Sequence, residues 1–67
     1  MMVTVNGEPR EIPAGMSVDQ LLRTLSVNPL LVAVEVNVTI LRREQYPAAI
    51  LSDGDTVEIV QMVGGGA

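Results

Sequence analysis

Only one stretch of this chain has the hydrophobic periodicity of a helix, and its apolar side needs another surface to cover it. Four apolar residues fall at the i, i+3, i+4, i+7 spacing of one helical stripe: Val18, Leu21, Leu22 and Leu25. Ser17 followed by Gln20 predicts a capping box at the start, and Asn28-Pro29 predicts the end. A helix of about ten residues does not hold in water unless it packs on something. We therefore expect it to lie across one face of a sheet.

Segments of β-type residues on both sides of this helix supply the sheet. Asn6-Gly7 is a strong hairpin signal, and Pro9 suits an edge strand or a strand start in the return segment. Residues 42–51 lack periodicity and predict a loop with a short helical turn that places Tyr46 or Ile50 inward. The predicted strands cover residues 1–5, 8–13, 30–37, 38–41 and 56–63.

The order hairpin, helix, strand, short strand, loop and last strand predicts an α+β fold. The first and last strands are expected side by side in the middle of the sheet and parallel, because the helix supplies the crossover that parallel pairing requires. By analogy this is the ubiquitin-like β-grasp arrangement, a mixed sheet of four to five strands with one helix packed across one face. Residues 1–63 would form this domain, and residues 64–67 a flexible Gly-rich tail.

The residue types that are missing restrict the function. At 67 residues there is room for one domain, and the chain contains no His, Cys or Lys. It therefore lacks the usual general base, thiol nucleophile, Schiff-base amine and zinc ligands, so we expect neither a self-contained enzyme nor a metal site. A net charge of −4 argues against nucleic acid as a partner. No run approaches the ~20 apolar residues of a membrane span, and we expect a cytoplasmic protein.

The C-terminal sequence "QMVGGGA" ends the chain on residues that are costly to order. Glycine-rich ends are often disordered tails or linkers. A tail without side chains can also thread a narrow channel in another protein, and a terminal glycine leaves its α-carboxylate unhindered. That carboxylate reacts only after activation, for example by adenylation with ATP. The chain has no phosphate-binding loop, so activation would have to come from a partner.

Three residues outside the tail are candidates for binding a partner. Val60 and Met62 fall on the strand face opposite Val57 and Ile59, and with Ala33 beside them they would form a small apolar patch near the tail. They could instead cap the core. Arg43 belongs to a charged run that could bind a partner but more often simply faces water.

Sequence blocks along nearly the whole chain resemble the ThiS family of small sulfur carriers of thiamin biosynthesis. The blocks that carry the resemblance are "VNGEP", "AGMSVDQLL", "VAVEVN", "VTILRREQY" and "LSDGDTVEIVQMVGGG". The resemblance implies that the C-terminal glycine is adenylated by a ThiF-type enzyme that uses ATP, and then becomes a thiocarboxylate with sulfur from a donor enzyme. It also implies that the sulfur passes to the thiazole synthase ThiG. The carrier itself would hold no cofactor and would be a monomer when free.

The family's diglycine end matches Gly65-Gly66, and Gly64 fills a small-residue position before it, but Ala67 follows. Either a protease removes Ala67 before Gly66 is activated, or Ala67 is not part of the native sequence. Because a residue follows the diglycine, a sulfur carrier for another pathway, such as molybdopterin, cysteine or methionine synthesis, is an alternative function. A ubiquitin-like protein modifier and a plain binding module with an inert tail are the alternatives from other classes.

Overall fold

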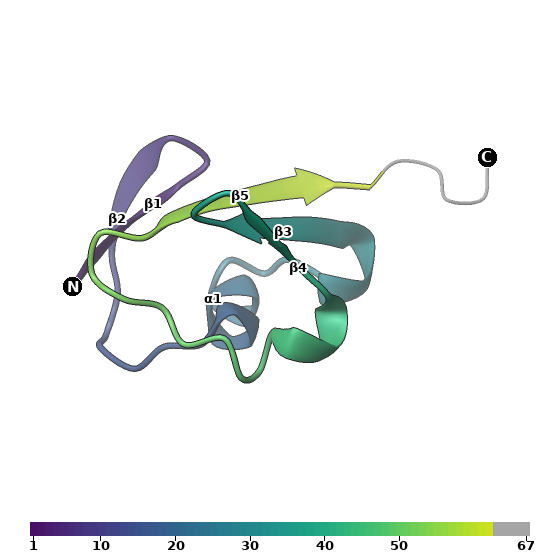
Figure 1. Cartoon of the computed structure of the whole chain (residues 1–67), viewed down its shortest axis with the longest axis horizontal. Coiled ribbons are helices and arrows are strands. Elements are labelled where there is room, and N and C mark those ends of the chain that lie inside the picture. Colours follow the sequence, from purple (N-terminus) through teal and green to yellow (C-terminus); the bar gives the residue numbers. More distant parts are fainter. Residues whose placement is uncertain (63–67) are drawn as a thin grey trace.

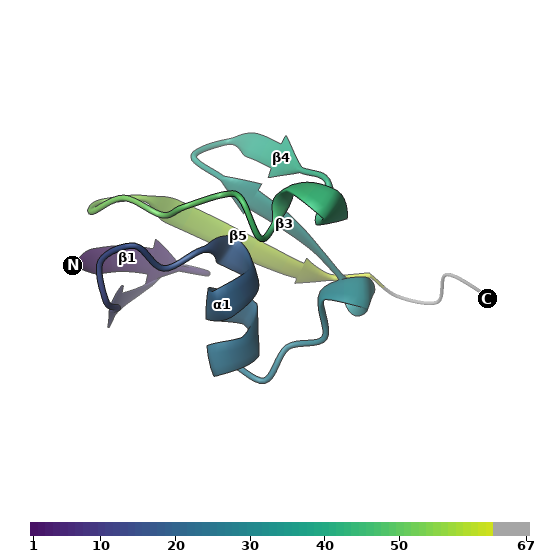
Figure 2. The same cartoon turned by 90° about the horizontal axis from the view of Figure 1, so that it is seen from below.

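The computed structural model of the chain describes residues 1–62. These residues form a mixed sheet with α1 lying across one of its faces (Figures 1 and 2), as the sequence predicts. Along the chain the elements are β1 (Met2–Val5), β2 (Glu8–Glu11), α1 (Val18–Thr24), η1 (Pro29–Leu31), β3 (Val32–Val36), β4 (Thr39–Leu41), η2 (Arg43–Gln45) and β5 (Thr56–Gln61), where η marks a 3₁₀ turn.

The strand order is β2-β1-β5-β3-β4, so β5 lies in the middle of the sheet. It pairs in parallel with β1 at Thr4↔Thr56 and antiparallel with β3 at Val34↔Ile59. The predicted parallel pair of first and last strands is confirmed, with α1 in the crossover between them. The last strand of the chain is therefore held by backbone hydrogen bonds on both of its edges.

The hairpin prediction is also confirmed. Asn6 and Gly7 have φ angles of 50° and 83°, the positive values that a two-residue hairpin turn requires at both central positions. Pro9 lies in β2, an edge strand, where its missing N–H costs no central ladder bond.

The core lies between the sheet and α1 and is aliphatic except for Tyr46. The helix buries Val18, Leu21 and Leu22, which belong to the predicted stripe, while Leu25 is only partly buried. Tyr46 is buried, whereas Ile50 is exposed, so the prediction that one of the two points inward is confirmed for Tyr46. The buried apolar set is Val3, Val5, Ile12, Val18, Leu21, Leu22, Val32, Val34, Tyr46, Leu51 and Val57.

The helix is shorter than the sequence pattern indicates, with 7 residues rather than about ten. It ends because Ser26 takes a left-handed conformation with a φ of 58°. The Ser26 N–H then donates to the Arg23 carbonyl (3.0 Å) and the Val27 N–H to the Leu22 carbonyl (2.8 Å). These are the two hydrogen bonds of a Schellman motif, here closed by serine where glycine is usual.

Every strand is one to three residues shorter than predicted, and the largest differences are at β2, β3 and β5; β2 ends at Glu11 rather than at residue 13. The predicted strand over residues 30–37 begins only at Val32, because Pro29–Leu31 forms η1. The Asn28 side chain caps this turn by accepting from the Leu30 N–H at 2.9 Å. The last strand ends at Gln61 rather than at residue 63. The short helical turn predicted within residues 42–51 is present as η2.

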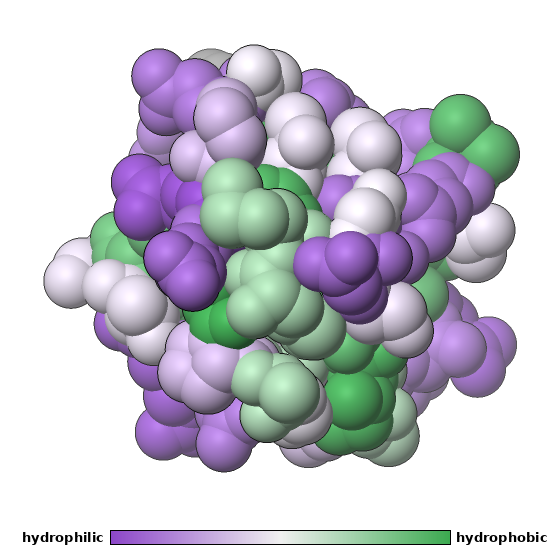
Figure 3. Space-filling model, turned by 90° about the vertical axis from the view of Figure 1, so that its left-hand side faces the viewer, coloured by the Kyte–Doolittle hydropathy of each residue, from purple (hydrophilic) through white to green (hydrophobic). Residues whose placement is uncertain are grey.

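Figure 3 looks at the end of the molecule opposite to the one at which β5 finishes. A band of hydrophobic residues crosses this surface, with hydrophilic residues on both sides of it. Exposed apolar side chains are therefore not confined to the end at which β5 finishes, and exposure alone does not identify a site.

Candidate functional site at the end of strand β5

The candidate tail starts from a strand end that backbone hydrogen bonds hold in place. Gln61 pairs with Val32, and the Met62 N–H donates to the Leu31 carbonyl at 2.8 Å. Met62 is the last residue that the structure describes. The predicted tail, Gly64, Gly65 and Gly66 with Ala67, lies outside the described residues, so its roles and its flexibility stay predictions.

Two asparagine side chains add further hydrogen bonds to β5. The Asn6 amide donates to the Ile59 carbonyl (3.2 Å) and accepts from the Ile59 N–H (2.7 Å). At the start of the strand, the Asn37 side chain accepts from the Thr56 N–H at 2.9 Å and donates to Asp55 at 2.8 Å. Both asparagines have positive φ angles, which asparagine tolerates better than most residues. The strand that leads to the glycines is thus fixed along its length.

Val60 lies on the sheet face opposite α1, as strand parity predicts. Val57, three residues earlier in β5, is fully buried against the helix side, whereas Val60 is 59% exposed and pairs with Ala33 on β3. Met62 is 51% exposed. The predicted apolar patch near the tail is therefore open to solvent, and its role in binding a partner stays a prediction.

Arg43 is not part of this patch. It lies in η2, outside the sheet, and is exposed. Within residues 1–62, the ion pairs are Arg23–Asp19 (2.9 Å) and Arg42–Glu44 (3.3 Å), and neither uses Arg43. Among the described residues, the Arg43 guanidinium therefore has no ion-pair partner, and Arg43 lies on a different element from Val60.

A shallow hollow lies on the open face beside Val60. It has a volume of about 220 Å³ and runs from β5 across β3 to Ile40 on β4. Its lining residues are Ala33, Val34, Glu35, Ile40, Glu58 and Val60. Sequence reasoning missed Glu35, Ile40 and Glu58, because alternation assigns a residue to a face but does not show which residues stand opposite each other across strands.

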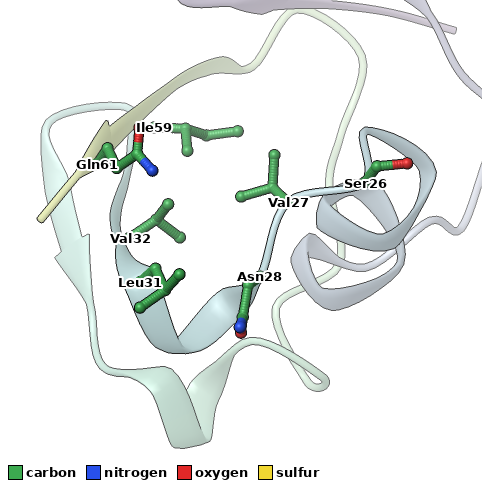
Figure 4. A pocket seen from close by; sticks show the side chains of 7 residues that line it. All are labelled: Ser26, Val27, Asn28, Leu31, Val32, Ile59 and Gln61. Carbon is green, nitrogen blue, oxygen red and sulfur yellow. The ribbon is translucent and has the colours of Figure 1, made fainter.

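A second hollow, of about 360 Å³, lies on the helix side of the sheet at the same end of β5. Figure 4 shows the side chains of Val27, Val32 and Ile59 directed into it, with Leu31 and Gln61 at its edge. Ser26 and Asn28 complete its lining. Both faces of the sheet are therefore hollowed next to the point where the chain leaves β5.

Within the described part of the chain, no group of three or more His, Cys, Asp or Glu side chains is placed to hold a metal ion. In the same residues, no helix has the length and apolar character needed to cross a bilayer.

Comparisons with known proteins agree with the fold. The sequence model of the ThiS family matches residues 3–66, a range that includes all three tail glycines. The sulfur carrier protein ThiS of Escherichia coli is 32% identical over 66 residues, which cover 98% of this chain and all of that protein. The crystal structure of the thiamine biosynthesis protein ThiS from Geobacter metallireducens superposes with a TM-score of 0.86 at 39% identity and covers 98% of this chain.

A longer relative also matches over the whole of this chain. The thiazole synthase of Paramagnetospirillum magneticum is 42% identical over 67 residues, but these make up only 21% of that protein. This chain thus spans about a fifth of the length of the thiazole synthase it resembles.

Proposed function

Because the chain belongs to the ThiS family, we propose that it is a sulfur carrier of thiamin biosynthesis whose C-terminal glycine, Gly66, carries the sulfur. The family match extends to residue 66 and supports this position for the reactive end. In this role the chain is a co-substrate of an activating enzyme rather than an enzyme, which is consistent with its lack of His, Cys and Lys.

The observation that carries the proposal is the fixed strand end from which the glycines start. β5 is paired on both edges, and the Met62 N–H is bonded to the Leu31 carbonyl. Four residues follow from Val63 to Gly66, and their full extension would reach about 14 Å beyond Met62. When a partner docks on the sheet, the Gly66 carboxylate therefore lies within that distance of Met62, at the edge of the docking surface.

The chemistry requires activation because a free carboxylate is a poor electrophile. In the proposed reaction, the Gly66 carboxylate oxygen attacks the α-phosphorus of ATP in a ThiF-type enzyme, and pyrophosphate leaves. Hydrosulfide (HS⁻), released by a donor enzyme, then attacks the acyl carbon of the acyl-adenylate and displaces AMP. The product is a thiocarboxylate, whose sulfur is a far better nucleophile than the oxygen it replaces. ATP is bound by the partner, and the carrier itself holds no cofactor.

Thiazole synthase is the proposed recipient of the sulfur. The support is the 42% identity between this chain and part of the Paramagnetospirillum thiazole synthase, in addition to the family match. That likeness favours the thiamin pathway over molybdopterin, cysteine or methionine synthesis as the destination.

Ala67 adds a step to the proposal. A peptide bond joins Gly66 to Ala67 in this sequence, so the Gly66 carboxylate becomes available only after that bond is hydrolysed. A chain that ends at Gly66 should be adenylated directly, whereas the chain that ends at Ala67 should form a thiocarboxylate at Gly66 only after trimming.

The test uses intact mass spectrometry at two levels. With a purified ThiF-type enzyme and ATP, the chain ending at Gly66 should gain the mass of an adenylate and release pyrophosphate. Protein isolated from its native cells should show loss of one alanine and replacement of one oxygen by sulfur. Failure of the trimmed chain to form an adenylate with its matched enzyme would rule out the sulfur-carrier proposal.

A further inference from the structure

The hollow on the open sheet face has an apolar base. Ala33, whose side chain is short, stands opposite Val60 on β5, and Ile40 on β4 stands opposite Glu35, the next residue of β3 on the same face. Ile40 is 73% exposed and Val60 is 59% exposed, and the two stand above the sheet diagonally across β3. The result is a depression that is lined by aliphatic groups and open to a partner.

Two carboxylates stand at one end of this depression. Glu35 and Glu58 are directly opposite each other in the antiparallel β3–β5 pair. Side chains at such positions have Cβ atoms about 5 Å apart, and like charges there repel each other. The Arg23–Asp19 and Arg42–Glu44 ion pairs of residues 1–62 leave both glutamates without a cation. The free chain therefore keeps an unfavourable acidic pair next to an apolar surface.

We propose that this hollow receives an arginine side chain from the enzyme that engages the tail. Arginine can bury an aliphatic stem against apolar groups while its guanidinium remains with charged partners. Here the stem would contact Ala33, Ile40 and Val60, and the planar fork would donate to both glutamates. Lysine fits less well, because its ammonium is a compact point charge that cannot match two acceptors with a rigid fork.

The position of the hollow identifies which partner would use it. Val60 lines the hollow and precedes Gly64 by only four positions in the sequence. A protein surface that takes up the glycines therefore also lies over this part of the sheet. The identity of that protein as the activating enzyme rests on the proposed function, whereas the shape and charge of the hollow do not.

The first test examines the hollow without any enzyme. Butylguanidinium, a mimic of the arginine side chain, is titrated into isotopically labelled protein, with neutral butylurea as the matched control. Amide shifts should cluster at Ala33, Glu35, Glu58 and Val60, saturate, and vanish in the Glu35→Gln, Glu58→Gln double variant. Shifts spread evenly over all acidic residues, or equal shifts with butylurea, would overturn the proposal.

The second test measures binding to the purified adenylating enzyme by calorimetry at several salt concentrations. Glu35→Gln and Glu58→Gln should each weaken binding roughly tenfold and reduce its salt dependence. Glu8→Gln makes the same charge change at an exposed site on edge strand β2 and should bind like the wild type. Neither hollow variant should lower the melting temperature, because each removes a repulsion, so weaker binding cannot be attributed to unfolding.

The two tests separate this inference from the proposed function. A wild-type chain that is never adenylated would defeat the sulfur-carrier proposal, and the butylguanidinium titration would still decide whether the hollow accepts a guanidinium. Normal adenylation together with wild-type affinity in the Glu35→Gln and Glu58→Gln variants would overturn the arginine site alone.

Discussion

At the scale of one residue, the Asn6 side chain forms hydrogen bonds to β5 of the kind that backbone groups form elsewhere in the sheet. The parallel β1–β5 ladder reaches only to Val5↔Val57, and the Asn6 side chain then bonds both polar groups of the Ile59 backbone. Its φ of 50° also suits asparagine better than alanine. We expect Asn6→Ala to lower the free energy of unfolding by about 2 kcal/mol, from two lost hydrogen bonds and added backbone strain. Urea denaturation measures the change.

Asn6→Gly is the matched control for this substitution. Glycine accepts the positive φ but lacks the amide, so it isolates the contribution of the hydrogen bonds and should cost less than alanine. Equal stability of Asn6→Ala and the wild type would show that the side chain does not hold β5.

Val38 presents the opposite case, a residue whose type conflicts with its backbone. Asn37 and Val38 form the turn between β3 and β4 with φ angles of 49° and 63°. The first hairpin places Gly7 at the equivalent position, but here a β-branched residue takes the left-handed conformation and is 89% exposed. Val38→Gly should raise the free energy of unfolding by about 0.5–1 kcal/mol, since relief of strain exceeds the entropy that glycine loses.

Thermal unfolding of Val38→Gly and Val38→Asn tests this expectation. Both substitutions suit the turn, so both should raise the melting temperature, and glycine should raise it more. A lower melting temperature in both variants would mean that Val38 makes a contribution that its backbone angle does not reveal.

At the scale of elements, α1 depends on its first turn. The Gln20 N–H donates to the Ser17 hydroxyl (3.1 Å), and the Ser17 N–H donates to the Gln20 side chain (3.0 Å). A helix of 7 residues has little stability of its own, so its cap and its packing decide whether it forms. Ser17→Ala should lower the free energy of unfolding by about 1 kcal/mol, and Ser17→Thr should restore most of it. Chemical denaturation monitored by circular dichroism measures both, and an unaffected Ser17→Ala variant would contradict the role of the cap.

The two ends of α1 show which features of an element can be predicted from sequence. Its start was predictable because the Ser17–Gln20 cap is a local motif written within four residues. Its end was not, because the Schellman bonds close on Ser26, and serine gives no signal for a left-handed conformation. The pattern of apolar residues continued to Leu25, so periodicity overestimated the length of the helix.

The strands show a similar division between local and long-range information. Alternation correctly placed Val57 inward and Val60 outward, because side chains switch faces at every residue. The pairing of Glu35 with Glu58 depends on the register between two strands that are far apart in the sequence. Nothing within either strand specifies that register, and the hollow they share with Ile40 became visible only in the folded chain.

At the scale of the whole molecule, the proposed function separates the folded residues 1–62 from an end that is proposed to react. Residues 1–62 contain a buried apolar core and a five-stranded sheet. The candidate end is predicted from composition and resemblance, since three glycines follow the last predicted strand, and it stays a prediction. The hollows on both faces of the sheet beside that end depend on tertiary packing and could not be predicted in this way.

We therefore expect that removing the C-terminal glycines prevents adenylation but leaves the free energy of unfolding nearly unchanged. A chain that ends at Val63 should differ from one that ends at Gly66 by less than about 0.5 kcal/mol in the free energy of unfolding, because both keep every core residue and strand pair described within residues 1–62. The shorter chain should nevertheless give no adenylate with a ThiF-type enzyme and ATP, because its carboxylate lies three residues short of the proposed reactive position and carries a β-branched side chain. Urea denaturation and intact mass spectrometry on the same two proteins measure the two quantities. A loss of stability above about 1 kcal/mol would mean that the glycines pack on the domain, and adenylation of the shorter chain would mean that the enzyme does not select the glycine end.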